Sequence, residues 1–315
     1  MDYVALILSG GEGTRLKPLT LKIPKPAIPL VNKPFLFYQM DLIESAGIEK
    51  CFLLSGYKAE ILKNTFKSKY KNLNIEIIEE KKPMGTGGAI GFAKSKINSG
   101  AIVFNGDVLF EVDLKEVIKE HKEREALGTI MAISVEDPSR YGVILMDEKG
   151  RIKEFLEKVK EPPSNWINAG LYILERKILE EIPDTPCSIE RDVFPQLLKK
   201  GFHFHCFKYK GYWKDIGTIQ SFKEATFDLI EGKVLRWKNE AREKRLLSMT
   251  DTVEIDEFSV IGLDCQLGKG VKIKKSIIFD GCKIGENSEI VHSIISFNLK
   301  IEKNRKIEGE VLIED

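Results

Sequence analysis

The sequence has little of what marks a secreted, membrane-spanning or nucleic-acid-binding protein. Its five cysteines are scattered, odd in number and without a CxxC pair, which favours a reducing, cytoplasmic setting. No apolar run approaches the ~20 residues of a membrane span, and the short N-terminal run follows an acid where a signal peptide has a base. The formal net charge of +1 disfavours a nucleic-acid-binding face. We therefore expect a soluble intracellular protein that binds neither nucleic acid nor a membrane.

The sequence also has few candidates for metal or nucleophilic chemistry. His203 and His205 alternate along one expected strand, but no third ligand is nearby in the sequence. His121 lies in a charged helical pattern, and His292 is isolated; both are expected to be structural. Cys187 has no base close to it in the sequence, so we do not expect a nucleophile there.

Short apolar runs alternate with helical patterns from residue 1 to about 232. This alternation predicts an α/β, Rossmann-like domain with a mixed, mostly parallel sheet covered on both faces. Ligands of such sheets bind beyond the carboxyl ends of the strands. Expected strands are 4–8, 50–54, 75–78, 101–104, 128–135, 142–145, 151–155, 167–174 and 203–207, and expected helices are 34–46, 58–70, 83–96 and 113–127.

The sequence changes character after residue 232. Residues 233–250 are highly charged with a helical pattern, which indicates a connector. From 251 to 315, aliphatic positions such as Ile255, Ile261 and Leu267 recur every six residues, several followed by glycine, which predicts a short β-helix. We expect three parts, 1–232, 233–250 and 251–315, and expect the last to promote homo-oligomerisation because so short a stack must pack on something.

The stretch "SGGEGTRLKPLT" follows the first expected strand and opens a glycine-rich loop. It lacks the third glycine of a dinucleotide fingerprint and the GK[ST] of a P-loop. Arg15 and Lys25, together with backbone N–H groups, suit a nucleoside triphosphate whose charge grows on a leaving pyrophosphate. The simpler alternative is a glycine turn with surface bases.

Two aspartates end apolar stretches far apart in the sequence, Asp107 in "FNGDV" and Asp215 in "GYWKDIGT". Magnesium is held by one or two carboxylates plus substrate phosphates, so this pair predicts a Mg²⁺ site. Either residue alone is equally consistent with a turn or helix cap.

Three further groups suit a hydroxylated or phosphorylated ligand. Glu157 and Lys158 end an expected strand, where the acid suits sugar hydroxyls and the lysine a phosphate, although such pairs also occur on plain surfaces. Asn168 lies inside an apolar strand and needs partners, from either a neighbouring loop or a ligand. Gly85 and Thr86 open a glycine-rich helix start, which permits close approach of a base or, alternatively, an N-cap by the threonine.

Taken together, these motifs resemble those of the sugar-1-phosphate nucleotidylyltransferases. The segments "LSGGEGTRLKPLT" with "KPAIPLVNKP", "GTGGA", "NGD", "EK", "NAGLYIL" and "WKDIGT" occur in order across the first domain. The hexapeptide tail resembles the left-handed β-helix that many members carry. Within the family, "VEDPSRYGVIL" and "SIERDVFP" look most like the mannose-1-phosphate guanylyltransferases.

The resemblance implies a role for each motif residue. Catalysis would depend on Arg15, Lys25 and Asp107, and Mg²⁺ would be held by Asp107 and Asp215. Nucleotide binding would involve Leu8, Gly10, Gly11, Gly13, Thr14, Arg15, Gly85 and Thr86. Sugar-phosphate binding would involve Gly142, Glu157, Lys158 and Asn168. The sequence departs from the family at Val159, where a proline usually follows Glu-Lys.

The reaction that the resemblance implies is attack of a sugar 1-phosphate oxygen on the α-phosphorus of a nucleoside triphosphate, with release of pyrophosphate. GTP and mannose 1-phosphate are the favoured substrates, and glucose-1-phosphate thymidylyl or uridylyl transfer is the main alternative. A non-catalytic nucleotide-sugar-binding regulatory subunit is an alternative of another class. A nicotinamide oxidoreductase is disfavoured by the broken fingerprint, and acyl transfer by the short tail.

Overall fold

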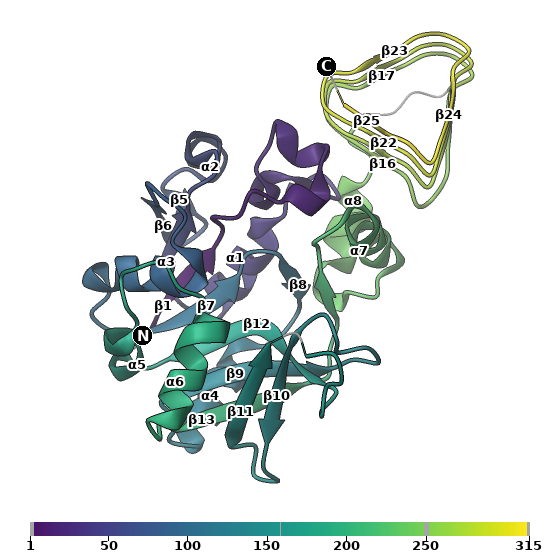
Figure 1. The fold of residues 1–315 in the computed structure, drawn as a ribbon. Coiled ribbons are helices and arrows are strands. Elements are labelled where there is room, and N and C mark those ends of the chain that lie inside the picture. The colour runs from purple at the N-terminus through teal and green to yellow at the C-terminus, as the bar shows by residue number, and fades with distance from the viewer. Residues whose placement is uncertain (1–2, 158, 249–251, 314–315) are drawn as a thin grey trace. The chain divides into compact units, whose positions relative to one another are not determined.

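The computed structural model describes residues 3–157, 159–248 and 252–313 (Figure 1). The chain forms two compact units, and the first comprises Met1–Glu12 and Leu36–Asp215. The second comprises Gly13–Phe35 and Ile216–Asp315, so the glycine-rich loop belongs partly to each. The linear domain boundaries at 232 and 250 stay a prediction. None of the described helices is long and apolar enough to cross a membrane.

The first unit is built on a mixed sheet with a parallel centre. Strands β7 (Gly100–Asn105), β1 (Tyr3–Leu8), β4 (Lys50–Ser55) and β6 (Leu73–Glu79) lie side by side and all run parallel. Their carboxyl ends therefore meet at one edge, as the βαβ alternation predicts. The main path runs β11-β10-β12-β7-β1-β4-β6-β5, and β9 joins β12 to β13.

Antiparallel strands extend the sheet beyond β7. Strand β12 (Trp166–Leu174) runs antiparallel to β7 and to β9 (Gly128–Ser134), which pairs in parallel with β13 (Phe204–Tyr209). Strands β10 (Gly142–Met146) and β11 (Ile152–Glu157) form a hairpin beside β12. The mixed sheet expected from the sequence is confirmed.

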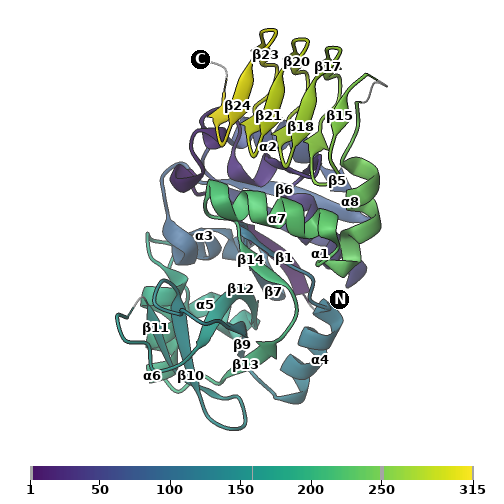
Figure 2. The same cartoon turned by 90° about the vertical axis from the view of Figure 1, so that its right-hand side faces the viewer.

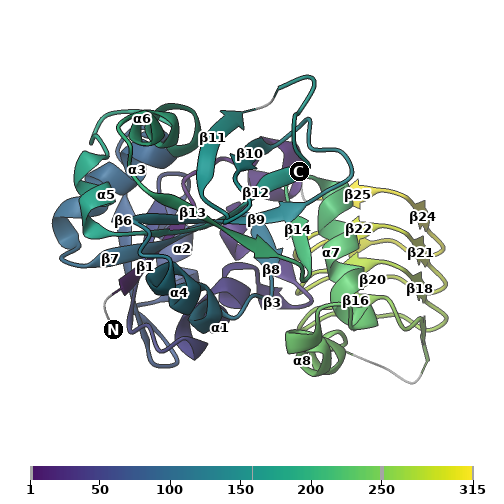
Figure 3. The same cartoon turned by 90° about the horizontal axis from the view of Figure 1, so that it is seen from below.

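Helices cover both faces of this sheet (Figure 3). One face packs α3 (Gly85–Ala93), α5 (Arg176–Glu181) and α6 (Phe194–Lys199) into a buried apolar core with the strands. Helices α1 (Leu36–Ser45) and α4 (Leu114–Glu123) lie on the other face.

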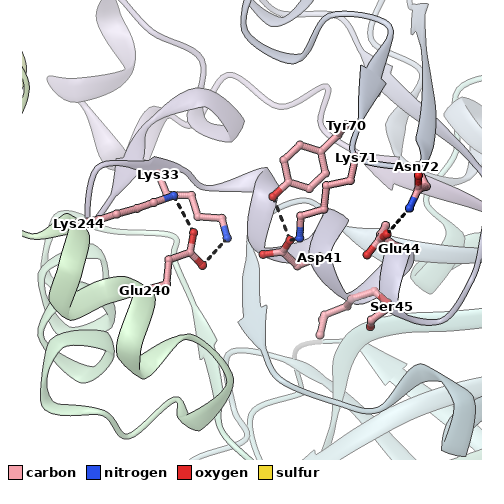
Figure 4. A network of polar contacts seen from close by, with 10 residues as sticks. Lys33, Asp41, Glu44, Ser45, Tyr70, Lys71, Asn72, Glu240 and Lys244 are labelled. Atoms are coloured by element: carbon pink, nitrogen blue, oxygen red, sulfur yellow. Dashed lines mark hydrogen bonds and ion pairs between the residues drawn. The ribbon is translucent and has the colours of Figure 1, made fainter.

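Two expected helices are too long: 58–70, and 113–127, where α4 ends at Glu123. Helix α2 covers Ala59–Phe66, whereas 58–70 was expected, and the two residues Lys69–Tyr70 form strand β5. Lys67 has φ 46° and ψ −163°, a conformation outside the helical region that ends the helix. Tyr70 then pairs with Leu73 of β6, and its hydroxyl donates to Asp41 at 2.9 Å (Figure 4).

The second unit begins with short 3₁₀ turns, Thr14–Leu16, Leu19–Leu21 and Lys25–Ala27, followed by a small hairpin of β2 (Pro29–Leu30) and β3 (Lys33–Pro34). Proline-rich sequence explains the absence of a longer helix here. In this hairpin Lys33 forms an ion pair with Glu240 at 2.9 Å (Figure 4). The Asn32 amide donates to the carbonyls of Lys244 and Ile261 at 2.7 and 2.8 Å.

Two helices continue the second unit. Helix α7 (Ile219–Glu231) begins with a capping box of Thr218 and Ser221 and ends at Gly232 in the left-handed region. Helix α8 (Lys238–Lys244) lies within the charged stretch that was expected to be a helical connector.

A left-handed β-helix completes the second unit, as expected (Figures 1 and 2). Its faces are three parallel sheets. They are β15 (Glu254–Ile255), β18 (Lys272–Lys274), β21 (Glu289–Val291) and β24 (Lys306–Glu308); β16 (Val260–Ile261), β19 (Ile277–Ile278), β22 (Ile294–Ile295) and β25 (Val311–Leu312); and β17 (Gln266–Leu267), β20 (Lys283–Ile284) and β23 (Lys300–Ile301).

The coils of this β-helix depart from a strict six-residue period. Val260, Ile277, Ile294 and Val311 are successive partners in register, so one coil here takes 17 residues rather than three full hexapeptides. Serines at equivalent positions stabilise the shortened corner: the Ser276 hydroxyl accepts from the backbone N–H of Ser293 at 3.1 Å. Interior aliphatic residues form a separate core.

Candidate active site

The first unit contains a cavity of about 700 Å³ that gathers predicted residues from several elements. Asp107 and Asp215 line it, as do groups expected to bind a sugar or a nucleotide. The predicted residues in its lining are Gly85, Thr86, Asp107, Gly142, Glu157, Asn168 and Asp215. Residues separated by more than 100 positions in the sequence therefore share one cavity.

Two very short strands bring the aspartates together. Asp107 immediately precedes β8 (Val108–Phe110), and Asp215 ends β14 (Trp213–Asp215), where it pairs with Val108. The buried Gln39 amide donates to the carbonyls of Asn105 and Val108, both at 2.9 Å, and so holds the turn that carries Asp107. This pairing supports the sequence-based expectation that both carboxylates act at one place.

The donor set fits a divalent metal that is shared with a substrate. Within the described ranges, no cluster of three or more His, Cys, Asp or Glu residues is arranged to hold a metal by itself. The Asn105 side-chain oxygen, which is also in the cavity lining, is buried and accepts no hydrogen bond from the described residues. Two carboxylates and a buried amide oxygen are hard ligands, which leaves further positions for phosphate oxygens.

Gly142 and Glu157 face each other across the β10–β11 hairpin. They are paired in register, and a β-carbon on Gly142 would lie 2.7 Å from a Glu157 carboxylate oxygen. Glycine is therefore required for the carboxylate to lie over this strand. An aromatic pair, Tyr141 and Trp213, forms another part of the lining with ring centroids 5.7 Å apart.

Asn168 obtains its partners from the protein. Its amide nitrogen donates to the Tyr172 hydroxyl at 2.6 Å, and its oxygen accepts from the backbone N–H of Gly170 at 2.9 Å. A register shift in β12 between Asn168 and Tyr172, with Gly170 at φ 79°, interrupts the regular strand pairing here. The amide is thus fixed in orientation while it lines the cavity.

Glu190 continues this network toward the glycine-rich helix start. Its carboxylate accepts from the hydroxyls of Tyr172 at 3.1 Å, Thr86 at 2.7 Å and Ser188 at 2.9 Å. Burial raises the pKa of Tyr172 well above its usual value, and the neighbouring Glu190 charge acts in the same direction. Tyr172 is therefore a hydrogen-bond donor at any physiological pH.

The glycines of "GTGGAIG" serve mainly to pack one segment against another. The backbone N–H groups of Gly87 and Gly88 donate to the Cys187 carbonyl at 2.9 and 3.2 Å. A β-carbon on Gly91 would lie only 2.0 Å from the Pro183 carbonyl oxygen. The glycines of α3 are thus needed because the backbone of residues 183–187 packs directly against this helix. The alternative N-cap role for Thr86 is wrong: helix α3 begins one residue earlier, and the Thr86 hydroxyl binds Ile189 N–H and Glu190.

Several cavity residues were missed by the sequence-based reasoning. Arg140 and Arg191 line the cavity and are exposed. Glu190 lies in a π-helical turn, Ile189–Val193, a feature that is often found at functional sites. The segments "DPSRYG" and "SIERD" contain Arg140, Glu190 and Arg191. A single charged residue in a loop does not indicate a binding site unless its neighbours in space are known. Lys158, the expected phosphate ligand, lies outside the described residues.

The remaining residues that were predicted to bind the nucleotide or to act in catalysis divide between the units. Leu8, Gly10 and Gly11 follow β1 in the first unit, and Gly13, Thr14, Arg15 and Lys25 belong to the second. Gly13 adopts φ 63°, and its carbonyl accepts from the Thr20 hydroxyl at 2.9 Å. Lys25 is largely buried at 8% exposure, whereas Arg15 is exposed.

His121 makes the structural contacts expected for it, and His205 makes similar ones. His121 contacts Thr129 at 2.7 Å and Glu175 at 3.1 Å, and His205 contacts Glu120 at 2.7 Å. Burial lowers the pKa of both histidines despite these acidic partners. Burial also raises the pKa of the Cys187 thiol, which disfavours a thiolate nucleophile.

Two family models match the chain. The nucleotidyl transferase model covers residues 4–232, and the GMPPB C-terminal domain model covers residues 246–315. Mannose-1-phosphate guanylyltransferase from Mycobacterium tuberculosis is 36% identical over 286 residues, which span 88% of this chain and 80% of that protein. Mannose-1-phosphate guanylyltransferase 1 from Arabidopsis thaliana is 35% identical over 283 residues, spanning 88% and 78%.

Similar solved structures agree with these family matches. HddC from Yersinia pseudotuberculosis complexed with GMP-PN aligns with a TM-score of 0.61 at 35% identity, covering 72% of this chain and 98% of that one. A putative glucose-1-phosphate thymidylyltransferase from Bacillus anthracis aligns with a TM-score of 0.66 over 71% of this chain and 94% of that one; at 24% identity it supports the fold alone.

Nucleotidyltransferases of this family generally use a divalent metal ion, which the two cavity aspartates suit. The chain belongs to the nucleotidyl transferase family, and the mannose-1-phosphate guanylyltransferases are among its relatives.

Proposed function

We propose that the protein transfers GMP from GTP to mannose 1-phosphate, giving GDP-mannose and pyrophosphate. The observation that carries this proposal is the pairing of β8 with β14, which brings Asp107 and Asp215 into a cavity lined by hydroxyl-binding groups. The named activity of the guanylyltransferase relatives supports the choice of base and sugar.

The residues of the cavity suit a phosphorylated hexose. Glu157 and Asn168 offer a carboxylate and an oriented amide for sugar hydroxyls. Arg140 and Arg191 supply positive charge in a lining that also contains several carboxylates. Lys158 keeps its predicted role as a ligand of the sugar phosphate.

The chemistry needs positioning and charge neutralisation more than a strong base. The sugar phosphate is already an anion, so its oxygen can attack the α-phosphorus in line. Asp107 and Asp215 would hold Mg²⁺, which when bound offsets the charge of the phosphates. Arg15 and Lys25 would bind the triphosphate and stabilise the leaving pyrophosphate.

We also propose that the protein acts in the cytoplasm and forms homo-oligomers through its β-helix. The five cysteines are all free, which suits a reducing compartment. The proposed oligomerisation is tested by light scattering of the full chain at micromolar concentration, where a strictly monomeric mass would contradict it.

The proposed site is tested with Asp107→Asn and Asp215→Asn. Both variants keep size and shape but remove a metal-binding charge, so pyrophosphate release from GTP and mannose 1-phosphate should fall by roughly 100-fold or more. Asp264→Asn is the control, because Asp264 has φ 55°, which asparagine also adopts, and it lies in the β-helix. Near-normal turnover by folded Asp107→Asn protein would contradict the site.

A further inference from the structure

Two of the five cysteines occupy equivalent places in successive coils of the β-helix. Cys265 immediately precedes β17 and Cys282 immediately precedes β20, and these strands are parallel neighbours (Figure 2). Gln266 pairs in register with Lys283, so the cysteines, each one position earlier, lie beside each other. None of the roles described above uses either residue.

The contacts of the two thiols repeat from one coil to the next. The Cys265 thiol donates to the Phe279 carbonyl at 3.2 Å, and the Cys282 thiol donates to the Ser296 carbonyl at 3.0 Å. The backbone is held as well, because the Gln266 N–H donates to the Cys282 carbonyl at 2.8 Å. Hydrogen bonding also links the side chains of Cys265 and Cys282, so their sulfurs are neighbours in the reduced protein.

The spacing of the coils suits a disulfide. Neighbouring strands lie about 4.8 Å apart, and the α-carbons of disulfide-linked residues are roughly 4.4–6.8 Å apart. Rotation of the two side chains can therefore close the bond without a large backbone movement. Cys51 and Cys206, by contrast, lie on β4 and β13, with four strands of the sheet between them.

The two thiols differ in exposure and in acidity. Cys265 is half-buried, whereas Cys282 is fully buried. Hydrogen bonds from the Cys282 thiol and from the backbone N–H groups of Cys282 and Gly281 lower the pKa of Cys265, although burial opposes them. The pKa of Cys282 is raised by its contact with Cys265 and by burial. Because the thiolate is the reactive form, Cys265 is the thiol that an oxidant reaches and oxidises first.

We propose that Cys265 and Cys282 form a reversible disulfide, which fastens two coils of the β-helix together when a peroxide oxidises the protein. The Cys265 thiolate attacks a peroxide oxygen, the O–O bond breaks, and hydroxide leaves while the sulfur becomes a sulfenic acid. The Cys282 sulfur then attacks the Cys265 sulfur. The S–S bond forms as the S–O bond breaks, and the Cys282 proton leaves with the hydroxyl group as water.

The bond would act as a staple on the β-helix. It joins residues one 17-residue coil apart, in a stack that has its own apolar core. A cross-link that closes a loop of this size restricts the unfolded chain, so oxidation should raise the Tm by roughly 5–10 °C. In a reducing compartment the bond would be transient, because thiol reductants reverse it by exchange.

Hydrogen peroxide treatment of the full chain, followed by thiol titration in denaturant, tests the proposal. Wild-type protein should lose two of its five thiols, and its intact mass should fall by two hydrogen atoms. Trypsin cleaves after Lys269 and Lys275, which lie between the cysteines, so unreduced digests should contain the two peptides joined by a disulfide. Dithiothreitol should restore both the thiols and the original Tm.

Cys265→Ser should lose no pair of thiols, and its Tm should not rise on oxidation. The matched control is Cys187→Ser, which removes the other half-buried thiol and should still lose two thiols and gain in Tm. The shift on oxidation is compared within each variant, so a different starting stability does not affect the result. If Cys265→Ser does not fold, Cys265→Ala takes its place.

The proposal is supported if wild type and Cys187→Ser form the joined peptides and gain in Tm while Cys265→Ser does neither. Retention of all five thiols in wild type would overturn it, as would a disulfide that involves another cysteine or oxidation of Cys265 to a sulfinic acid in place of the bond. A disulfide between Cys265 and Cys282 that leaves the Tm unchanged would overturn the staple. These readouts are independent of the enzymatic activity, so they stand apart from the proposed function.

Discussion

Tyr172→Phe removes a single buried oxygen from the network that orients Asn168. The Tyr172 side chain is 0% exposed, and its hydroxyl accepts from the Asn168 amide at 2.6 Å while donating to Glu190 at 3.1 Å. Phenylalanine leaves Asn168 and Glu190 each short of one hydrogen bond, and it also removes the acceptor of the Asn105 amide at 3.4 Å. The expected loss in the free energy of unfolding is roughly 1.5–3 kcal/mol. For a unit of this size that corresponds to a fall in Tm of about 3–10 °C.

The same change should weaken sugar-phosphate binding. Without the tyrosine oxygen, the Asn168 amide keeps only its bond from the Gly170 N–H and is less firmly oriented. We therefore expect KM for mannose 1-phosphate to rise by roughly three- to tenfold, with a smaller change in kcat. Steady-state kinetics at saturating GTP and differential scanning fluorimetry measure the two effects.

Tyr70→Phe is the matched control for this experiment. It also removes a hydroxyl that donates to a carboxylate, that of Asp41 at 2.9 Å, but neither residue lines the cavity (Figure 4). Its Tm should fall while KM stays unchanged. If Tyr172→Phe changes neither Tm nor KM, or if both variants change KM alike, the orienting role of the network is refuted.

Two further predictions concern packing and pH. Gly91→Ala places a β-carbon 2.0 Å from the Pro183 carbonyl oxygen and should lower the free energy of unfolding by about 3 kcal/mol. In Gly11→Ala the new β-carbon meets nothing within 4 Å, so the change should be less than about 0.5 kcal/mol. Urea unfolding measures both, and equal losses would contradict the packing. Burial lowers the pKa of His121 and His205 below the ordinary 6.5, so the unfolded chain binds protons more readily than the folded one. The stability that the neutral histidines contribute is therefore complete above pH 6.5. It should be lost as the pH falls toward 5. Unfolding measured from pH 8 to 5 should show this loss, and His205→Gln should reduce it; identical pH profiles for the variant and wild type would contradict it.

The sequence was most informative where local chemistry determines the structure. The glycine turn after the first strand, the Thr218 cap and the six-residue period each follow from backbone requirements within a few residues. Asp107 and Asp215 were also expected to act together, although their meeting depends on β8 and β14, each only three residues long. Strands that short leave no periodicity to detect.

Contacts between distant segments were beyond prediction from the sequence. The glycines around Gly88 were interpreted as space for a ligand, whereas the backbone at Thr185 occupies much of it. Glu190 and Arg191 belong to a π-helical turn that no local pattern announces, and their role depends on Tyr172, which comes from another strand.

The central claim is tested most directly by pyrophosphate release with Mg²⁺ across GTP, dTTP, UTP, ATP and CTP, each combined with the 1-phosphates of mannose, glucose, galactose and N-acetylglucosamine. We predict that GTP with mannose 1-phosphate gives the highest kcat/KM. A preference for dTTP or UTP with glucose 1-phosphate would contradict the assigned substrates while leaving the reaction intact. No release from any pair, by protein that still binds nucleotide, would contradict the enzymatic function itself.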